Sequence, residues 1–204
     1  MGLYWLIFVV IAYLIGAIPF GYLIGKYIYG VDVRTKGSGN TGATNVYRVL
    51  GSKAGGLTAL LDILKGFIPV IVVRFFFNDP MILASVGIAA VFGHIFSVYL
   101  RFKGGKGIAT SFGVGLALCP GCVLFALGVW LVVASMTNYI SLSSIIAFLF
   151  GTICTIFFAP RSVTTAFFLM FLLITVAHRE NIYRLLHGTE RKTPMPWQKK
   201  KSSQ

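Results

Sequence analysis

The chain has 204 residues, of which 57% are hydrophobic and only 11% are charged. Because a soluble domain carries roughly 25% charged residues, this composition excludes an ordinary soluble protein and predicts a single membrane domain. The net charge is +13. The basic residues lie in short connections between apolar runs, which indicates orientation in a membrane rather than nucleic-acid binding.

Seven apolar runs predict an all-α integral membrane protein, a bundle of about seven transmembrane helices. The runs are 3–25, 54–76, 80–100, 107–119, 121–137, 140–158 and 162–178. Several are near or below the roughly 17–20 residues that a crossing helix needs, so we expect some to tilt or to be re-entrant. We assign residues 1–192 to this single domain and 193–204 to a polar, basic tail that is expected to be disordered.

The basic residues are distributed unequally between the two ends of the predicted helices. Fifteen of the 18 Lys and Arg residues fall in the segments 26–53, 101–106 and 178–204, on one side. Arg74 and Arg161 fall on the other side, and Lys65 lies inside a helix. The excess of positive charge predicts that the first side is cytoplasmic. Seven crossings then put the N-terminus outside and the C-terminus in the cytoplasm.

The first polar cluster, Gly37-Ser-Gly-Asn-Thr-Gly-Ala-Thr-Asn45, lies on this side and is followed by Arg48. Glycines let backbone amides converge on an anion, hydroxyl and amide side chains add donors, and an arginine fork suits phosphate. A flexible loop is the alternative, since these are also common turn residues. Their density favours a phosphate site. Its candidate residues are Gly37, Ser38, Gly39, Asn40, Thr41, Asn45 and Arg48.

The second polar cluster, Phe102-Lys-Gly-Gly-Lys-Gly107, precedes a hydrophobic helix. Lysines and glycines at a helix N-terminus predict a phosphate site, because the helix dipole also favours anions. The spacing lacks the Walker A pattern of nucleotide triphosphatases. A basic membrane-flanking loop is the alternative, but it has no need for consecutive glycines. The candidate residues are Lys103, Gly104, Gly105, Lys106, Gly107 and Thr110, with Lys106 expected to make the strongest phosphate contact.

The third polar cluster is His178-Arg-Glu-Asn181, with Arg184 and Glu190 after it. If this segment is helical, His178, Asn181 and Arg184 share one face. A histidine there can act as a base or donate to a phosphate, although a single His at a helix end is more often an ordinary polar residue. Two other anion-binding clusters on the same side favour the functional interpretation.

Polar residues inside the apolar runs allow two interpretations each. Asp62 and Lys65 are three residues apart in one helix, so they can pair, and their cost in a membrane means that they face the protein interior. This pair has a structural or a direct role. His94 and Ser97, one turn apart, are equally ambiguous.

Two further motifs lie near helix ends. Ser141 and Ser144, at a cytoplasmic helix start, either complete a polar pocket or satisfy the first helical amides. Cys119-Pro-Gly-Cys122 has the spacing of a redox motif, but we interpret it as a turn between two membrane segments with unpaired cysteines. No second cysteine pair is available for a zinc site, and the sequence predicts no metal.

Together the three clusters resemble the motifs of the membrane acyl-phosphate:glycerol-3-phosphate acyltransferase family (PlsY). The matching segments are Gly37-Ser-Gly-Asn-Thr-Gly-Ala-Thr-Asn-Val-Tyr-Arg-Val-Leu-Gly51, Gly93-His-Ile-Phe with Phe102-Lys-Gly-Gly-Lys-Gly-Ile-Ala-Thr110, and His178-Arg-Glu-Asn-Ile-Tyr-Arg-Leu-Leu-His-Gly-Thr-Glu190. They occur in the family's order, so the likeness covers nearly the whole chain up to Glu190. Ser97 stands where the family usually has proline, which affects the local helix end.

The resemblance implies a seven-helix bundle in the bacterial cytoplasmic (inner) membrane, with its active site facing the cytoplasm. It implies transfer of a fatty acyl group from acyl phosphate to the 1-hydroxyl of glycerol 3-phosphate, giving lysophosphatidic acid and phosphate. The partners are then these two substrates and membrane lipid, with no metal or organic cofactor. It also implies that Ser38, Arg48, His178 and Asn181 act in the active site, that residues 103–107 bind glycerol 3-phosphate, and that Glu190 is structural.

An acyl phosphate is already activated, so its reaction needs orientation and charge neutralisation more than a strong base. We therefore predict direct transfer without an acyl-enzyme. Ser38 is expected to donate a hydrogen bond to a phosphate group, and the hydroxyl proton is expected to pass to the leaving phosphate or to His178. The alternatives are a transporter of an anionic phosphorylated metabolite and a non-catalytic scaffold. A transporter favours binding groups near the bilayer midplane and an internal repeat, whereas these clusters gather at one face.

Overall fold

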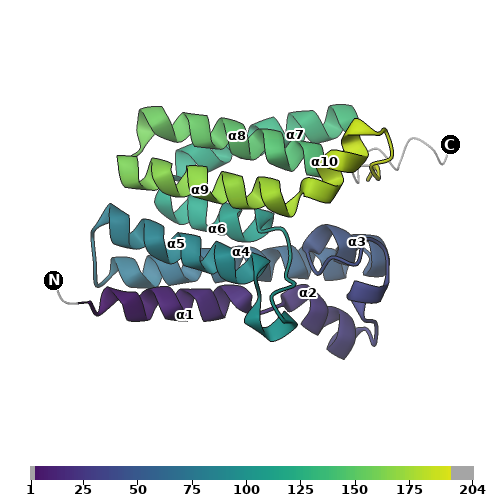
Figure 1. Ribbon diagram of the computed structural model, residues 1–204, viewed down its shortest axis with the longest axis horizontal. Helices are drawn as coiled ribbons and strands as arrows, with labels where there is room; N and C mark the ends of the chain where they lie inside the picture. Colours follow the sequence, from purple (N-terminus) through teal and green to yellow (C-terminus); the bar gives the residue numbers. More distant parts are fainter. Residues whose placement is uncertain (1–2, 194–204) are drawn as a thin grey trace.

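The computed structural model describes residues 3–193, which form an all-helical bundle whose long helices run side by side (Figure 1). The long helices are α1 (Trp5–Ala17), α4 (Ser52–Arg74), α5 (Pro80–Ile95), α6 (Ile108–Leu118), α7 (Pro120–Thr137), α8 (Ile140–Phe158) and α9 (Arg161–Ala177). The shorter helices α2 (Phe20–Leu23), α3 (Ala43–Leu50) and α10 (Arg179–Leu186) lie at the end of the bundle opposite the start of α1. The described residues also include a π-helical turn, η1 (Ile24–Ile28), and the 3-10 turns η2 (Val33–Thr35) and η3 (Val98–Leu100).

The lengths of the helices fit an integral membrane protein. Within residues 3–193, five helical stretches are long and apolar enough to cross a membrane, and six if α9 and α10, which meet at a bend of 61°, form one span. Helix α6 has 11 residues, which at 1.5 Å per residue is about 16 Å, half the thickness of the hydrocarbon core. The all-helical membrane fold is thus confirmed, whereas seven crossings and the orientation of the termini stay predictions.

The first apolar run, 3–25, does not form the continuous helix that we predicted. Helix α1 ends at Ala17, and the chain resumes a helical course at Phe20. Pro19 lies at the break, where it has no N–H to donate to the preceding turn. The carbonyl of Ile18 instead accepts from Lys65 Nζ at 2.7 Å. The break is therefore stabilised by a side chain of α4. It donates a hydrogen bond to a backbone carbonyl that would have no partner in lipid.

The run 80–100 is also shorter as a helix than predicted. Helix α5 ends at Ile95, and the chain turns through η3 at Val98–Leu100. Ser97, at the family's proline position, is buried in this turn and donates its hydroxyl to the carbonyl of Ala17. The turn and the end of α1 are thereby joined.

Helix α6 lies between two groups of helices, α1, α4 and α5 on one side and α7, α8 and α9 on the other (Figure 1). Its close approach to α4 depends on glycine. A Cβ on Gly66 would lie 2.2 Å from the carbonyl oxygen of Thr110, and one on Gly113 would lie 2.0 Å from that of Ile63. Small residues at such contacts let helix backbones meet closely within a membrane. This packing fixes the loop that leads into α6.

The polar segment 26–53, which lies outside the seven predicted helices, contains the amphipathic helix α3. It begins after Gly42 and ends at Gly51, whose φ of 88° is a conformation that glycine adopts without strain. Its buried Val46 packs with Ile24, Val33 and Ala54 in a small apolar cluster. This cluster holds the first polar cluster of the sequence against the start of α4.

Two smaller predictions concern the chain turns. We predicted that Cys119-Pro-Gly-Cys122 forms a turn between two membrane segments, but only Cys119 lies between α6 and α7, because Pro120 begins α7. Both cysteines are free thiols, as predicted. Of the predicted tail 193–204, residues 194–204 lie outside the described part of the chain. Thr193 is held in place rather than disordered, because its N–H donates to the carbonyl of Asn138 at 2.8 Å.

Candidate functional site

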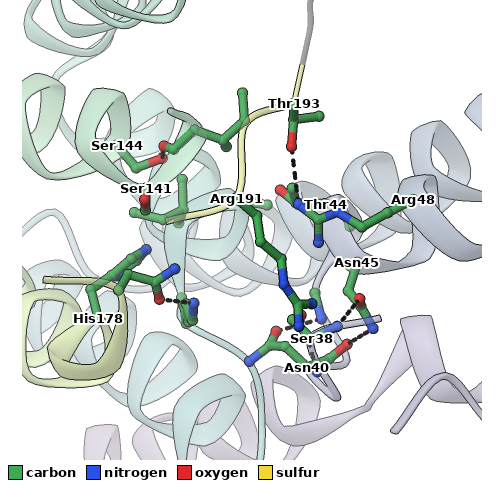
Figure 2. A pocket seen from close by; sticks show the side chains of 18 of the residues that line it. Ser38, Asn40, Thr44, Asn45, Arg48, Ser141, Ser144, His178, Arg191 and Thr193 are labelled. Carbon is green, nitrogen blue, oxygen red and sulfur yellow. Dashed lines mark hydrogen bonds between the residues drawn. The ribbon is translucent and has the colours of Figure 1, made fainter. Parts of the chain in front are cut away.

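The three polar clusters of the sequence meet around one cavity of about 200 Å³ at the end of the bundle where α3 and α10 lie (Figure 2). Its lining includes Ser38, Asn40, Asn45 and Arg48 from the first cluster, Lys106 and Gly107 from the second, and His178, Asn181, Arg184 and Glu190 from the third. Ser141 and Ser144, at the start of α8, line it too. Residues separated by more than 100 positions in the sequence thus form a single polar site.

Asn45 folds the first cluster. It is buried at the start of α3, and its amide nitrogen lies 3.0, 3.1 and 2.9 Å from the carbonyl oxygens of Val33, Lys36 and Asn40. Its Oδ1 accepts the backbone N–H of Ser38 at 2.7 Å. The amide of Asn45 is therefore used in shaping the loop, and Ser38 is presented at a fixed position on the cavity wall (Figure 2).

The other candidates of the first cluster divide between shaping and lining. Gly37 has a φ of 63°, and a Cβ there would lie 2.3 Å from Asn45 Oδ1, so glycine is required. Asn40 Oδ1 accepts the N–H of Gly42 at 2.8 Å. Gly37, Gly39 and Thr41 are not among the residues that line the cavity, whereas Arg48 extends into it from α3.

The second cluster is folded against the end of α5. The N–H groups of Gly104 and Gly105 donate to the carbonyls of Ile95 and His94, both at 3.0 Å. A Cβ on Gly105 would lie 2.1 Å from His94 Nε2. These glycines are therefore needed for the close approach of the loop to His94, and their amides are not available to an anion in the cavity.

Lys106 and Gly107 are the members of the second cluster that line the cavity. Gly107, with a φ of 84°, turns the chain into α6. The ammonium of Lys106 donates to Asn181 Oδ1 and so joins the second cluster to the third. Lys103 is exposed and Thr110 is buried, and neither lines the cavity.

His178 lies at the junction of α9 and α10 and is buried. Its Nδ1 lies 2.8 Å from the carbonyl oxygen of Ile174. Because a carbonyl can only accept, Nδ1 carries a proton, which leaves Nε2 as the acceptor of a neutral ring. The ring lines the cavity (Figure 2). His178, Asn181 and Arg184 all line the cavity, in agreement with the predicted common face.

Glu190 is the centre of a hydrogen-bond network in the cavity wall beside α10. Its Oε1 accepts from Ser141 Oγ at 2.8 Å and from Asn181 Nδ2 at 2.6 Å, and its Oε2 accepts from Arg184 Nε at 2.7 Å. Burial raises the pKa of this carboxyl, but the three hydrogen bonds outweigh burial and hold the pKa below its ordinary value. Glu190 thus remains charged and orients Asn181.

The charge of the cavity wall is predominantly positive. Arg48, Lys106, Arg184 and Arg191 line it. Burial lowers the pKa of Lys106 to about 8, with Arg184 and Arg48 acting in the same direction and Glu190 in the opposite one. Burial and Arg191 likewise lower the pKa of Arg48. The carboxylates of the described chain do not balance this positive charge. Such an excess of cationic side chains is expected of a site that binds phosphate groups.

Several lining residues were not among the candidates from the sequence. Arg191 reaches across the cavity towards Ser38 and Asn40, and Thr193 Oγ1 accepts from Arg48 Nη2 at 2.9 Å (Figure 2). Both belong to the segment after Glu190, where no motif marks them. Asp62 and His94, which we left ambiguous, also line the cavity.

A second, apolar cavity of about 360 Å³ adjoins the polar one. It is lined by α4, α6, α7, α8 and α9, with Phe112, Phe148 and Phe167 among its walls. Trp130 and Ser144 line both cavities, and Trp130 Nε1 donates to Ser144 Oγ at 3.2 Å between them. Ser144 also donates to the carbonyl of Ile140, so its hydroxyl is satisfied within the helix. A molecule with a charged head and an alkyl tail would fit the two cavities together.

The chain is similar to proteins of one family. A family model described as glycerol-3-phosphate acyltransferase matches residues 6–188. A glycerol-3-phosphate acyltransferase of Trichlorobacter lovleyi is 48% identical over 193 residues, which is 94% of this chain and 97% of that protein. One of Thermotoga petrophila is 43% identical over 189 residues, or 92% and 96%.

Two solved structures have a similar fold. Both are crystal structures of PlsY, an integral membrane glycerol 3-phosphate acyltransferase. The glycerol 3-phosphate form has a TM-score of 0.89 and 44% identity and covers 93% of this chain and 95% of that one. The lysophosphatidic acid form has a TM-score of 0.87 and 43% identity, with 92% and 94% covered.

Proposed function

Since the chain belongs to the glycerol-3-phosphate acyltransferase family and is an acyltransferase, we propose that it transfers a fatty acyl group from acyl phosphate to the 1-hydroxyl of glycerol 3-phosphate. The products are lysophosphatidic acid and inorganic phosphate. Relatives bear the acceptor in their name, and a similar structure is described in a lysophosphatidic acid form. The two cavities support acyl phosphate as the donor.

The observation that carries the proposal is the junction of the two cavities at Trp130 and Ser144. A long acyl chain lies in the apolar cavity and reaches it from lipid, while its reactive head enters the polar cavity. The carbonyl carbon then lies at the junction, next to the acceptor hydroxyl. Bringing two reactants together in this way supplies much of the rate enhancement of a group transfer.

The charges of the polar cavity suit an acyl phosphate better than a neutral donor. A phosphate monoester carries about −1.5 to −2 charges at pH 7, so two phosphate groups together bring between three and four. Four cationic side chains line the cavity: Arg48, Lys106, Arg184 and Arg191. Glu190 pairs with Arg184, so the site offsets most of the negative charge of the two substrates and stabilises the charge that passes to the departing phosphate.

The transfer takes place in one step. The 1-hydroxyl oxygen attacks the acyl carbon, the bond between that carbon and the phosphate oxygen breaks, and the hydroxyl proton goes to the leaving phosphate or to Nε2 of His178. The hydroxyl of Ser38 donates a hydrogen bond to a phosphate group. Arg48, Asn181 and Lys106 also bind the phosphate groups of the substrates. No acyl-enzyme is formed. Acyl phosphate is already activated, so a covalent intermediate on a nucleophilic side chain would not make the transfer easier.

The protein lies in the inner membrane of a bacterial cell, and its active site faces the cytoplasm. The basic residues that flank the helices support this orientation, because positive segments stay on the cytoplasmic side. The polar cavity lies where α3, α10 and the start of α8 meet, at one end of the bundle rather than near its middle, which disfavours transport of a phosphorylated metabolite.

The proposed donor is tested with purified protein in lipid vesicles. Acyl phosphate and glycerol 3-phosphate are expected to give lysophosphatidic acid, whereas acyl-CoA or acyl carrier protein with the same acyl chain gives none. Product from acyl-CoA at a rate equal to that from acyl phosphate would show that the donor is wrong.

A further inference from the structure

Asp62 and His94 form a polar pair in the wall of the polar cavity, next to the glycines of the second cluster. Asp62 lies in the middle of α4 and is 2% exposed, and His94, near the end of α5, is 7% exposed. His94 Nδ1 lies 3.7 Å from Asp62 Oδ1, which is too far for a hydrogen bond. Both residues line the cavity.

Lys65 explains how Asp62 is buried as a charge. Its Nζ lies 2.7 Å from Asp62 Oδ1 and donates to the carbonyl of Ile18 at 2.7 Å, and it also lies 5.5 Å from the ring centre of Phe20. The lysine is therefore fully engaged at the break after α1. Its partner is not, because a carboxylate has two oxygens and about four lone-pair sites.

Apart from the ion pair with Lys65, neither Asp62 Oδ1 nor His94 Nδ1 has a hydrogen-bond partner among residues 3–193. Buried polar atoms of this kind are rare in proteins and call for an explanation such as a ligand. Leaving a buried carboxylate with so few donors is costly unless a bound group supplies one.

The other carboxylate and amide acceptors of the cavity wall already accept hydrogen bonds from the protein. They are Asn40, Asn45, Asn181 and Glu190. His178 Nε2 is free to accept, but the proposed transfer assigns it to the reacting hydroxyl. Asp62 is thus the acidic acceptor of the described cavity wall with capacity to spare.

One group of glycerol 3-phosphate, its 2-hydroxyl, has no binding residue in the proposed reaction. The phosphate is bound by cations and the 1-hydroxyl reacts, while the 2-hydroxyl is a donor that needs an acceptor. We propose that the carboxylate of Asp62, with the ring of His94 beside it, binds the 2-hydroxyl of the acceptor. This inference rests on the proposed function and makes the pair the specificity element for the glycerol backbone.

A site built to bond a hydroxyl rejects an analogue that lacks it, because the buried acceptor is then left unpaired. The test compares glycerol 3-phosphate with 3-hydroxypropyl phosphate, which keeps the phosphate and the primary hydroxyl but has no 2-hydroxyl. The wild-type protein is expected to prefer glycerol 3-phosphate by about 10- to 100-fold in kcat/KM, as expected for one hydrogen bond to a charged acceptor.

Two variants assign this preference to Asp62. Asp62→Asn keeps the size of the side chain but removes its charge, and the double variant Asp62→Leu/Lys65→Met removes the ion pair as a unit, which buried pairs often tolerate. In the double variant, the preference for glycerol 3-phosphate is expected to fall to within about threefold, because the analogue never used the lost bond. In Asp62→Asn the amide oxygen can still accept a weaker bond, so the preference is expected to fall by about five- to tenfold. A loss of folded protein lowers both activities alike, so a fall in their ratio reports the lost bond and not misfolding.

Asp79→Asn is the matched control. Asp79 caps the far end of α5, where its carboxylate accepts the N–H of Met81 at 2.8 Å, and it does not line the cavity. Its substitution is expected to leave the preference unchanged. Equal use of both acceptors by the wild-type protein, or full preference retained in either Asp62 variant, would overturn the inference. If the wild-type protein acylates neither acceptor, the proposed function itself fails.

Discussion

The ammonium of Lys106 donates to the side-chain oxygen of Asn181 and so joins the loop before α6 to helix α10. Residues that are far apart in the sequence thereby share one anion site, with Arg48 facing them from α3. Glu190, which accepts from Asn181 Nδ2, orients the amide for this contact. The position of this lysine is fixed before a substrate binds, which suits the role of phosphate ligand that we propose for it.

The Michaelis constant for glycerol 3-phosphate is expected to depend on Lys106. Lys106→Ala removes one charge-assisted hydrogen bond and should raise this constant by about 10- to 100-fold. Lys103→Ala is the control, because Lys103 is exposed and does not line the cavity. An unchanged constant in the Lys106 variant would contradict the assignment.

The activity should fall in alkaline solution because of the same residue. Burial lowers the pKa of Lys106 from 10.5 to about 8, so its ammonium is present below that pH and is lost as the pH rises through it. Values of kcat/KM for glycerol 3-phosphate, which report the free enzyme, are expected to decline above about pH 8. In Lys106→Arg the decline should move to higher pH, because arginine stays charged. A decline at the same pH in both proteins would assign it to another group.

His178 is expected to contribute to the chemical step. Its Nε2 is an acceptor on the cavity wall because Nδ1 donates to Ile174. Loss of a positioned proton acceptor typically lowers kcat by about 10²- to 10⁴-fold, so His178→Ala should fall in this range. His187→Ala is the control, since His187 is exposed and stacks on Tyr183 outside the cavity. Near-normal turnover of the His178 variant would remove it as a base and leave the proton to phosphate.

The apolar cavity predicts an effect that depends on acyl-chain length. Ala147 of α8 is buried in its wall, so Ala147→Phe fills part of the space. The rate with a long-chain acyl phosphate should fall by about tenfold or more, with little change for a short chain, because added bulk excludes methylenes. Ile153→Phe, on an exposed face of α8, is the control. Equal losses for both chain lengths would place the acyl chain elsewhere.

Glu190 is expected to stabilise the fold as well as the site. It accepts from Ser141, Asn181 and Arg184, so Glu190→Gln leaves a half-buried arginine without its charged partner. We expect a loss of about 1–3 kcal/mol in the free energy of unfolding at pH 7. The pKa of Glu190 lies below 4.5, so its contribution is present above that pH and is lost as the pH falls through the folded value. The difference between the two proteins in thermal unfolding should therefore shrink in acid.

Much of this arrangement could be predicted from the sequence, because long apolar runs and clustered polar residues are strong signals in a membrane protein. Helix α8, for instance, has the predicted bounds 140–158. The charge pattern also brought three distant clusters to one side, and Ser38, Lys106 and His178 do line one cavity.

Other features depended on tertiary contacts that no local pattern contains. The glycine amides at 104 and 105 looked like anion ligands, but the carbonyls of α5 accept them. Asn45 looked like a substrate ligand, whereas its amide holds the loop around Ser38. Arg191 lies in an unremarkable polar segment and becomes part of the site only because the chain folds back over α3.

Direct transfer from acyl phosphate is tested by a single turnover with protein in excess over acyl phosphate. Without glycerol 3-phosphate, we expect no burst of inorganic phosphate and no acylated protein. Addition of glycerol 3-phosphate should then release phosphate and form lysophosphatidic acid in equal amounts. A burst of phosphate before the acceptor is added, with the acyl group retained on the protein, would contradict it.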